Sequence, residues 1–171
     1  MININTIMNK NPSKLAQYAP LVTIIGLAAL GSVALSRTEG YSMDRFMHLF
    51  MGLFLLQFSA LKLFDVRGFV KGFAKYDLLA MRSRTYGLIY PFLELTLALG
   101  YLAGGAIWVY IATFILMGFG AVGVLRALAK GLDTNCACLG TTLKVPLSTV
   151  AITENVSMAA MAIFMFITHT I

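Results

Sequence analysis

Five long apolar segments separated by short polar intervals constrain this chain more than any other feature. They run from about Pro20 to Ser36, Met43 to Phe64, Tyr86 to Ala103, Ile107 to Leu128 and Pro146 to Ile167. A helix of roughly 17–25 apolar residues crosses the hydrocarbon core of a bilayer, so each segment is long enough to span it. Only 12% of the residues are charged, whereas a soluble domain has about 25%. The sequence predicts an all-α, polytopic membrane protein with five spans.

The first segment has two interpretations. Two lysines before its apolar run and small residues near its end are typical of a signal peptide: Lys10, Lys14, Gly31, Ser32 and Ala34. The long stretch before the run favours an uncleaved helix. We therefore predict a tail and an extra transmembrane helix in residues 1–42, followed by a four-helix membrane domain in residues 43–171.

Lys and Arg are distributed unevenly between the two sides of the predicted membrane. Eleven of the 13 lie in the N-terminal tail and in the second and fourth connections. The second connection contributes Lys62, Arg67, Lys71, Lys75, Arg82 and Arg84. Basic residues favour the cytoplasmic side, so the N-terminus is expected inside and the C-terminus outside, with a bacterial inner membrane as the setting. Because these residues form no patch or stripe, the net charge of +6 does not indicate a nucleic-acid partner.

The second connection has the pattern of an amphipathic helix over residues 68–84. Its apolar positions recur at three- and four-residue spacing, at Phe69, Phe73, Tyr76 and Ala80, and its basic residues fall largely on another face. This pattern favours a helix in the membrane interface, with its basic side toward anionic headgroups. A cytoplasmic extension of the second span explains the pattern equally well.

The two cysteines of the chain stand one residue apart, at Cys136 and Cys138, in the fourth connection. The charge distribution places them on the cytoplasmic side. No second Cys or His pair completes a structural zinc site, but thiolates select soft ions such as Cu(I). The pair could also form a strained, easily reduced disulfide, or be two unreactive buried residues.

Two further groups of residues could carry chemistry. Met43, Met47 and Met51 share one face of the second span, beside His48; thioether and imidazole groups bind copper, although packing is the better explanation for the methionines. Glu94 and Glu154 fall near the middle of the third and fifth spans. Acids at that depth face the bundle interior with a partner or a proton. They indicate either a structural hydrogen bond or the handling of protons or cations.

The order of motifs resembles the MauE/DoxX family of redox-associated membrane proteins, in the branch sometimes joined to heavy-metal-associated domains. The motifs are FMHLFMG from Phe46, KLFD from Lys62, YDLLA from Tyr76, YGLIYPFLEL from Tyr86, CACLGT from Cys136 and KVPLS from Lys144. The resemblance covers about residue 43 to the C-terminus. It implies a DoxX-like four-helix membrane bundle, a role in maturing disulfide-rich envelope proteins, and a redox or metal-handling role for Cys136 and Cys138.

Three functions follow from these observations. The first is a membrane thiol-redox protein that exchanges disulfides with a thioredoxin-like partner; a quinone or a partner protein would supply its second redox station. The second is soft-metal transport of Cu(I) or Hg(II), with Met43, Met47 and His48 at the outer end, the cysteines inside, and a metal-carrying partner that receives the ion. The third is a non-catalytic assembly partner in the lipid bilayer.

Overall fold

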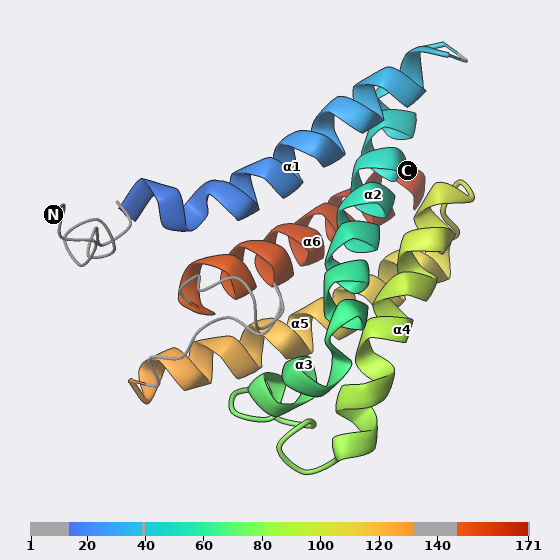
Figure 1. The fold of residues 1–171 in the computed structure, drawn as a ribbon. Helices are drawn as coiled ribbons and strands as arrows, with labels where there is room; N and C mark the ends of the chain where they lie inside the picture. The colour runs from blue at the N-terminus through green and yellow to red at the C-terminus, as the bar shows by residue number, and fades with distance from the viewer. Residues whose placement is uncertain (1–13, 39, 132–146, 171) are drawn as a thin grey trace, which may run out of the picture.

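The computed structural model describes residues 14–38, 40–131 and 147–170, which form six α-helices and no strand. The helices are α1 (Lys14–Arg37), α2 (Met43–Phe64), α3 (Val66–Phe73), α4 (Arg84–Leu102), α5 (Ile107–Ala129) and α6 (Leu147–Thr170). Figure 1 shows α2 beside α4 and α5 beside α6, with α1 crossing the upper part of α2. The prediction of an all-helical chain is confirmed.

Four helices are long and apolar enough to cross a membrane: Tyr18–Arg37 of α1, all of α2, all of α5, and Val150–His169 of α6. The third predicted span also forms a single helix, α4, but its composition does not meet the same criterion. Three tyrosines, a proline and Glu94 make α4 more polar than the other long helices. The structure therefore supports a multi-pass membrane protein and leaves the count of five spans as a proposal.

Small residues allow close packing between neighbouring helices. On α1, Ala28, Ser32 and Ser36 are fully buried, and α1 packs along α2. A Cβ on Gly52 of α2 would lie 2.7 Å from the Leu102 side chain of α4. Small residues at such contacts let helix backbones approach closely. Lipid tails are as apolar as the helix surfaces, so the hydrophobic effect does not bring membrane helices together, and close van der Waals packing contributes to their association instead.

The predicted helix over residues 68–84 is shorter than expected. Helix α3 starts after Asp65, whose backbone angles (φ −137°, ψ 68°) are not helical and end α2. The Asp65 side chain accepts a 2.9 Å hydrogen bond from the Gly68 amide. It ends at Phe73, and the chain continues through turns to α4. The expected apolar face is nevertheless buried: Phe69, Phe73, Tyr76 and Ala80 are at most 4% exposed. Helix α3 is thus neither a long interfacial helix nor a straight extension of α2.

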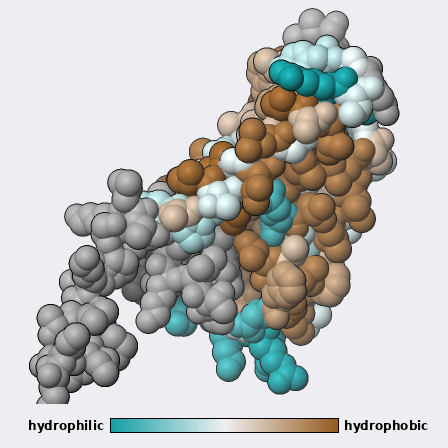
Figure 2. Space-filling view, turned by 45° about the horizontal axis from the view of Figure 1, so that its top comes forward, coloured by the Kyte–Doolittle hydropathy of each residue, from teal (hydrophilic) through white to brown (hydrophobic). Residues whose placement is uncertain are grey.

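The outer surface is mainly apolar between two polar ends. Large exposed side chains on it include Leu30, Phe92, Leu99, Ile115, Phe119 and Phe164. Figure 2 shows this surface in brown, with hydrophilic residues in teal gathered mainly at the two ends of the visible face. Exposed basic residues mark the end formed by α3, the start of α4 and the end of α5: Arg67, Lys71, Lys75, Arg82, Arg84, Arg126 and Lys130. This arrangement is typical of a protein whose middle faces lipid.

Candidate functional site

A buried lysine and two buried glutamates meet where α2, α4 and α6 converge. Lys62 Nζ lies 2.5 and 2.6 Å from the two carboxylate oxygens of Glu94 and 2.7 Å from Glu154 Oε1. The exposed fractions of the three side chains are 0–1%. We call these three residues the Lys62 cluster. Since α2 packs on α4 and α5 packs on α6, the contact with Glu154 joins the two helix pairs.

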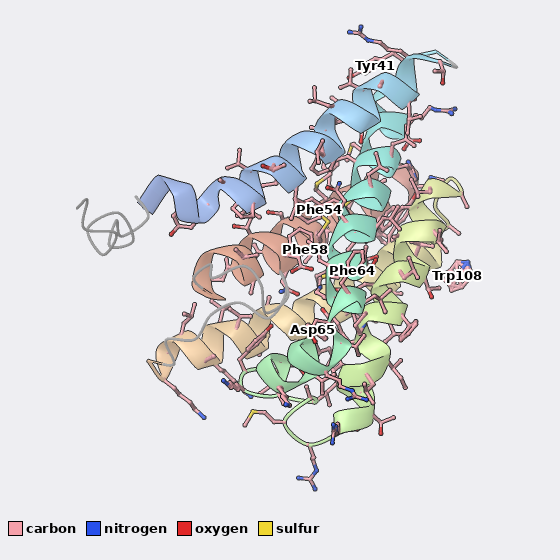
Figure 3. All side chains as sticks on the ribbon, viewed as in Figure 1. Tyr41, Phe54, Phe58, Phe64, Asp65 and Trp108 are labelled. Atoms are coloured by element: carbon pink, nitrogen blue, oxygen red, sulfur yellow. The ribbon has the colours of Figure 1, made fainter. Side chains whose placement is uncertain are left out.

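Aromatic side chains surround the ammonium group of Lys62. Its Nζ lies 5.4–5.8 Å from the ring centroids of Phe58, Phe69 and Tyr90, a separation at which a ring face attracts a cation. The Tyr90 side chain also hydrogen-bonds Glu94. In Figure 3, Phe54 and Phe58 point from α2 toward α6, into the core where both are buried. The surroundings exclude water and strengthen the electrostatic contacts within the cluster.

Sequence reasoning placed both acids in the interior but assigned Lys62 to the second connection, as a charge that orients the protein. That assignment was wrong, because Lys62 lies inside α2, in the last turn of the helix. Its side chain is 1% exposed. One signal could have identified it. Two acids deep in predicted spans need a cation, and Lys62 is a basic residue within a predicted span.

Two other polar residues of α2 and α6 hydrogen-bond within their own helices. Gln57 donates to the Leu53 carbonyl at 3.2 Å, and Asn155 donates to the Ala151 carbonyl at 2.8 Å. Glu154 Oε2 accepts no hydrogen bond from any residue that the structure describes. The second carboxylate oxygen of Glu154 is therefore the open position of the cluster.

His48 belongs to a second polar group, at the opposite end of α2. Its Nε2 lies 2.6 Å from the Tyr110 hydroxyl of α5, and its Nδ1 lies 2.8 Å from the Asp44 carbonyl oxygen. The rings of Tyr101 and Tyr110 lie about it, with centroids 6.3 and 5.8 Å away. A cavity of about 590 Å³ opens beside His48, between the start of α2 and the end of α4. Both ring nitrogens of His48 are thus already engaged.

The three predicted methionine ligands differ in how far they are buried. Met43 is 63% exposed, Met47 is partly buried, and Met51 is fully buried in the core. Within the described ranges, no group of three or more His, Cys, Asp or Glu side chains could hold a metal ion. For Met47 and Met51 this arrangement is that of packing residues. Cys136 and Cys138 lie outside the described residues.

Comparison with known proteins relates most of the chain to one family. No curated protein and no solved structure matches it. A family model described as methylamine utilisation protein MauE matches residues 40–168. The match starts next to α2 and includes all three residues of the Lys62 cluster, together with the segment that contains Cys136 and Cys138. The chain therefore belongs to the MauE family of methylamine utilisation proteins.

Proposed function

We propose that this protein is a membrane thiol–disulfide exchange protein that supports the maturation of envelope proteins in methylamine utilisation, with a quinone or a partner protein linking its cysteine pair on the cytoplasmic side to the envelope. The observation that carries the proposal is the Cys-x-Cys pair, Cys136 and Cys138, within the part of the chain that matches the MauE family. The pair stands between α5 and α6, two apolar helices that pack along each other.

The exchange needs both sulfurs. In the oxidising direction, a thiolate of the partner attacks one sulfur of the Cys136–Cys138 disulfide and forms a mixed disulfide, while the other cysteine leaves as a thiolate. A second partner thiolate then displaces the remaining cysteine, so the partner gains the disulfide and the pair becomes a dithiol. Reoxidation removes two electrons and two protons. A quinone in the bilayer, or the disulfide of a thioredoxin-like protein, would accept them.

The packing of α4 supports a fifth crossing of the membrane. Helix α4 runs beside α2, and the short turn at residues 103–106 leads directly into α5. Gly105, in this turn, lies against the His48 side chain near the start of α2, so α4 runs back along α2 and recrosses the same thickness if α2 spans it. Its polar residue Glu94 pairs with Lys62, and this pairing reduces the free-energy cost of a carboxylate inside the membrane. Five crossings put the termini on opposite sides, and the basic end of the molecule is expected inside.

Soft-metal transport has less support in the described residues. The carboxylates that an ion would pass are bound to Lys62, and His48 is engaged by Tyr110 and Asp44. A transported Cu(I) ion also prefers sulfur and imidazole ligands to carboxylates. A non-catalytic assembly role would need neither cysteine. Both functions are alternative outcomes of the following experiment.

The experiment follows the redox state of the pair in membranes. The chain contains two cysteines, so the mass added by a thiol-alkylating reagent reports on this pair alone. We expect wild-type protein to exist partly as a disulfide, and the single variant Cys138→Ser or Cys136→Ser to trap a mixed disulfide with a partner. Thiols that stay reduced in every condition, with no trapped partner, would contradict the exchange function. Loss of bound Cu(I) in the double serine variant, with unchanged partner oxidation, would support the metal function instead.

A further inference from the structure

The charges of the Lys62 cluster do not balance. Two carboxylates and one ammonium leave one negative charge where all three side chains are 0–1% exposed. An uncompensated charge in such a place is strongly destabilising. Two carboxylates that share one site avoid this cost when one of them keeps a proton.

The hydrogen bonds distinguish the two carboxyl groups. An ammonium group has three N–H donors, and Lys62 directs two bonds to Glu94 and one to Glu154 Oε1. All three donors are thereby used. Both oxygens of Glu94 are bound, as expected for an ionised carboxylate, while Glu154 Oε2 has no hydrogen-bond partner among the described residues. The three donors of Lys62 therefore satisfy three of the four carboxyl oxygens, so the cluster lacks a donor for a second fully ionised carboxylate.

We propose that the Lys62 cluster is a proton-binding site in which Glu94 and Glu154 together carry one exchangeable proton. The proposal does not depend on the thiol chemistry of the cysteines. Among the described residues, the titratable groups that face the cluster are Tyr90 from α4 and, farther out, Tyr86 and Asp77. Tyr86 interacts electrostatically with both Asp77 and Glu94. The described residues offer no further cation beside the two acids and no group of three ligands for a metal ion.

Proton binding would change how α6 is held. When the shared proton lies on Glu154, Lys62 donates to a neutral carboxyl group. After release both partners are charged, and the contact becomes an ion pair, which is stronger than a bond from an ammonium group to a neutral carboxyl group. The contact links the α2/α4 pair to α6. Occupancy of the site by a proton is therefore coupled to the strength of this link.

Infrared spectroscopy of the full-length protein in lipid nanodiscs tests the proposal. A protonated carboxyl group has a C=O stretching band that an ionised carboxylate lacks, and ¹³C-labelling of glutamate shifts the band only when the acid is a glutamate. We expect one such glutamate band at neutral pH in wild type, and its loss at alkaline pH. The wild-type measurement needs no variant, so it tests the proposal even if a substitution prevents folding.

A set of variants checks the proton count. Glu154→Gln and Glu94→Gln each leave one carboxylate for one ammonium, so both should lose the band. Lys62→Met leaves two acids without a cation and should show about twice the wild-type intensity. Glu39→Gln, the remaining glutamate of the chain, should keep the band and serves as the control. A wild-type spectrum without the band, or a band that survives in Glu154→Gln or Glu94→Gln, would overturn the proposal.

Discussion

At the scale of single residues, Lys62 is expected to have the largest effect on stability. Lys62→Met removes the only ammonium group that contacts Glu94 and Glu154 among the described residues. Breaking a buried ion pair by deleting one partner costs roughly 3–5 kcal/mol, because the remaining charge is left uncompensated. We expect a loss near the lower end of this range at neutral pH, since the acids can take up protons, and a greater loss at alkaline pH. Thermal unfolding in detergent micelles measures it.

Two comparison variants separate this effect from a general loss of charge. The triple variant Lys62→Met, Glu94→Gln and Glu154→Gln has no buried charge in the cluster and should recover most of the lost stability, since replacing a complete buried network is often neutral. Lys71→Met changes an exposed lysine of α3 and should stay within about 0.5 kcal/mol of wild type. If the triple variant is as unstable as Lys62→Met alone, the uncompensated charge is not the cause.

Asp77 provides a pH-dependent prediction outside the spans. Its Oδ1 accepts hydrogen bonds from the Leu79 and Ala80 amides at 2.9 and 2.8 Å. Burial raises the pKa of Asp77 above its usual value of 3.8, although these two amide bonds oppose the rise. The folded state therefore binds the proton more tightly than the unfolded chain, and the contribution of Asp77 to stability falls as the pH rises from 3.8 through the raised pKa.

The variants Asp77→Asn and Asp77→Ala distinguish charge from hydrogen bonding. Asparagine keeps an oxygen for both amides but cannot ionise, so Asp77→Asn should lack this fall with pH and match or exceed wild type at neutral pH. Asp77→Ala leaves both amides without their acceptor and should lose about 1 kcal/mol. Melting temperatures measured across the acidic to neutral range give both comparisons. A parallel pH dependence in wild type and Asp77→Asn would show that Asp77 does not titrate in this range.

At the scale of elements, the close approach of α5 to the turns before α4 depends on Gly123. A Cβ at Gly123 would lie 3.0 Å from the Tyr76 carbonyl oxygen and 3.3 Å from Asp77 Cα, which are backbone atoms that cannot move aside alone. Gly123→Ala should therefore cost about 1–3 kcal/mol, as overpacking usually does. Thermal unfolding of the purified protein measures this cost.

Gly118, in the same helix, is the matched control because nothing lies within 4 Å of its added Cβ. Gly118→Ala should be neutral or stabilising by up to about 1 kcal/mol, since alanine favours the helix over glycine. Equal effects of the two substitutions would show that helix propensity, and not the contact with the turns, determines the role of Gly123.

The sequence predicted elements better than it predicted the direction of their side chains. Apolar length located α2 and α5 within a residue at each end, because a helix that faces lipid must stay apolar along its length. The end of α3 at Phe73 was missed, because the apolar spacing continues through Tyr76 and Ala80, which are buried by turns and not by a helix. The contact of Lys62 with Glu154 joins residues 92 positions apart, and no local pattern encodes it.

At the scale of the whole molecule, the number of crossings follows from how the helices pack. Lys62 was counted among the orienting charges, yet it is buried; without it, most basic residues still lie in the same connections. The exposed ones gather at the end of the molecule formed by α3 and the start of α4. At the other end, Trp108 projects away from the bundle (Figure 3) and is 58% exposed, as expected for an aromatic residue at a membrane interface.

Reporter fusions in a bacterial host test whether α4 crosses. A fusion after Lys75, in the connection before α4, and a fusion after Gly104, in the turn after it, should report opposite sides of the membrane, with the Lys75 fusion in the cytoplasm. A pair of reporters, one active only in the cytoplasm and one only outside, gives a positive signal in each location. If α4 lay on the surface, both fusions would report the same side, and α5 would start where α2 ends. The observed packing of α4 along α2 favours the crossing, because a surface helix would lie across the bundle and could not bring Glu94 to Lys62.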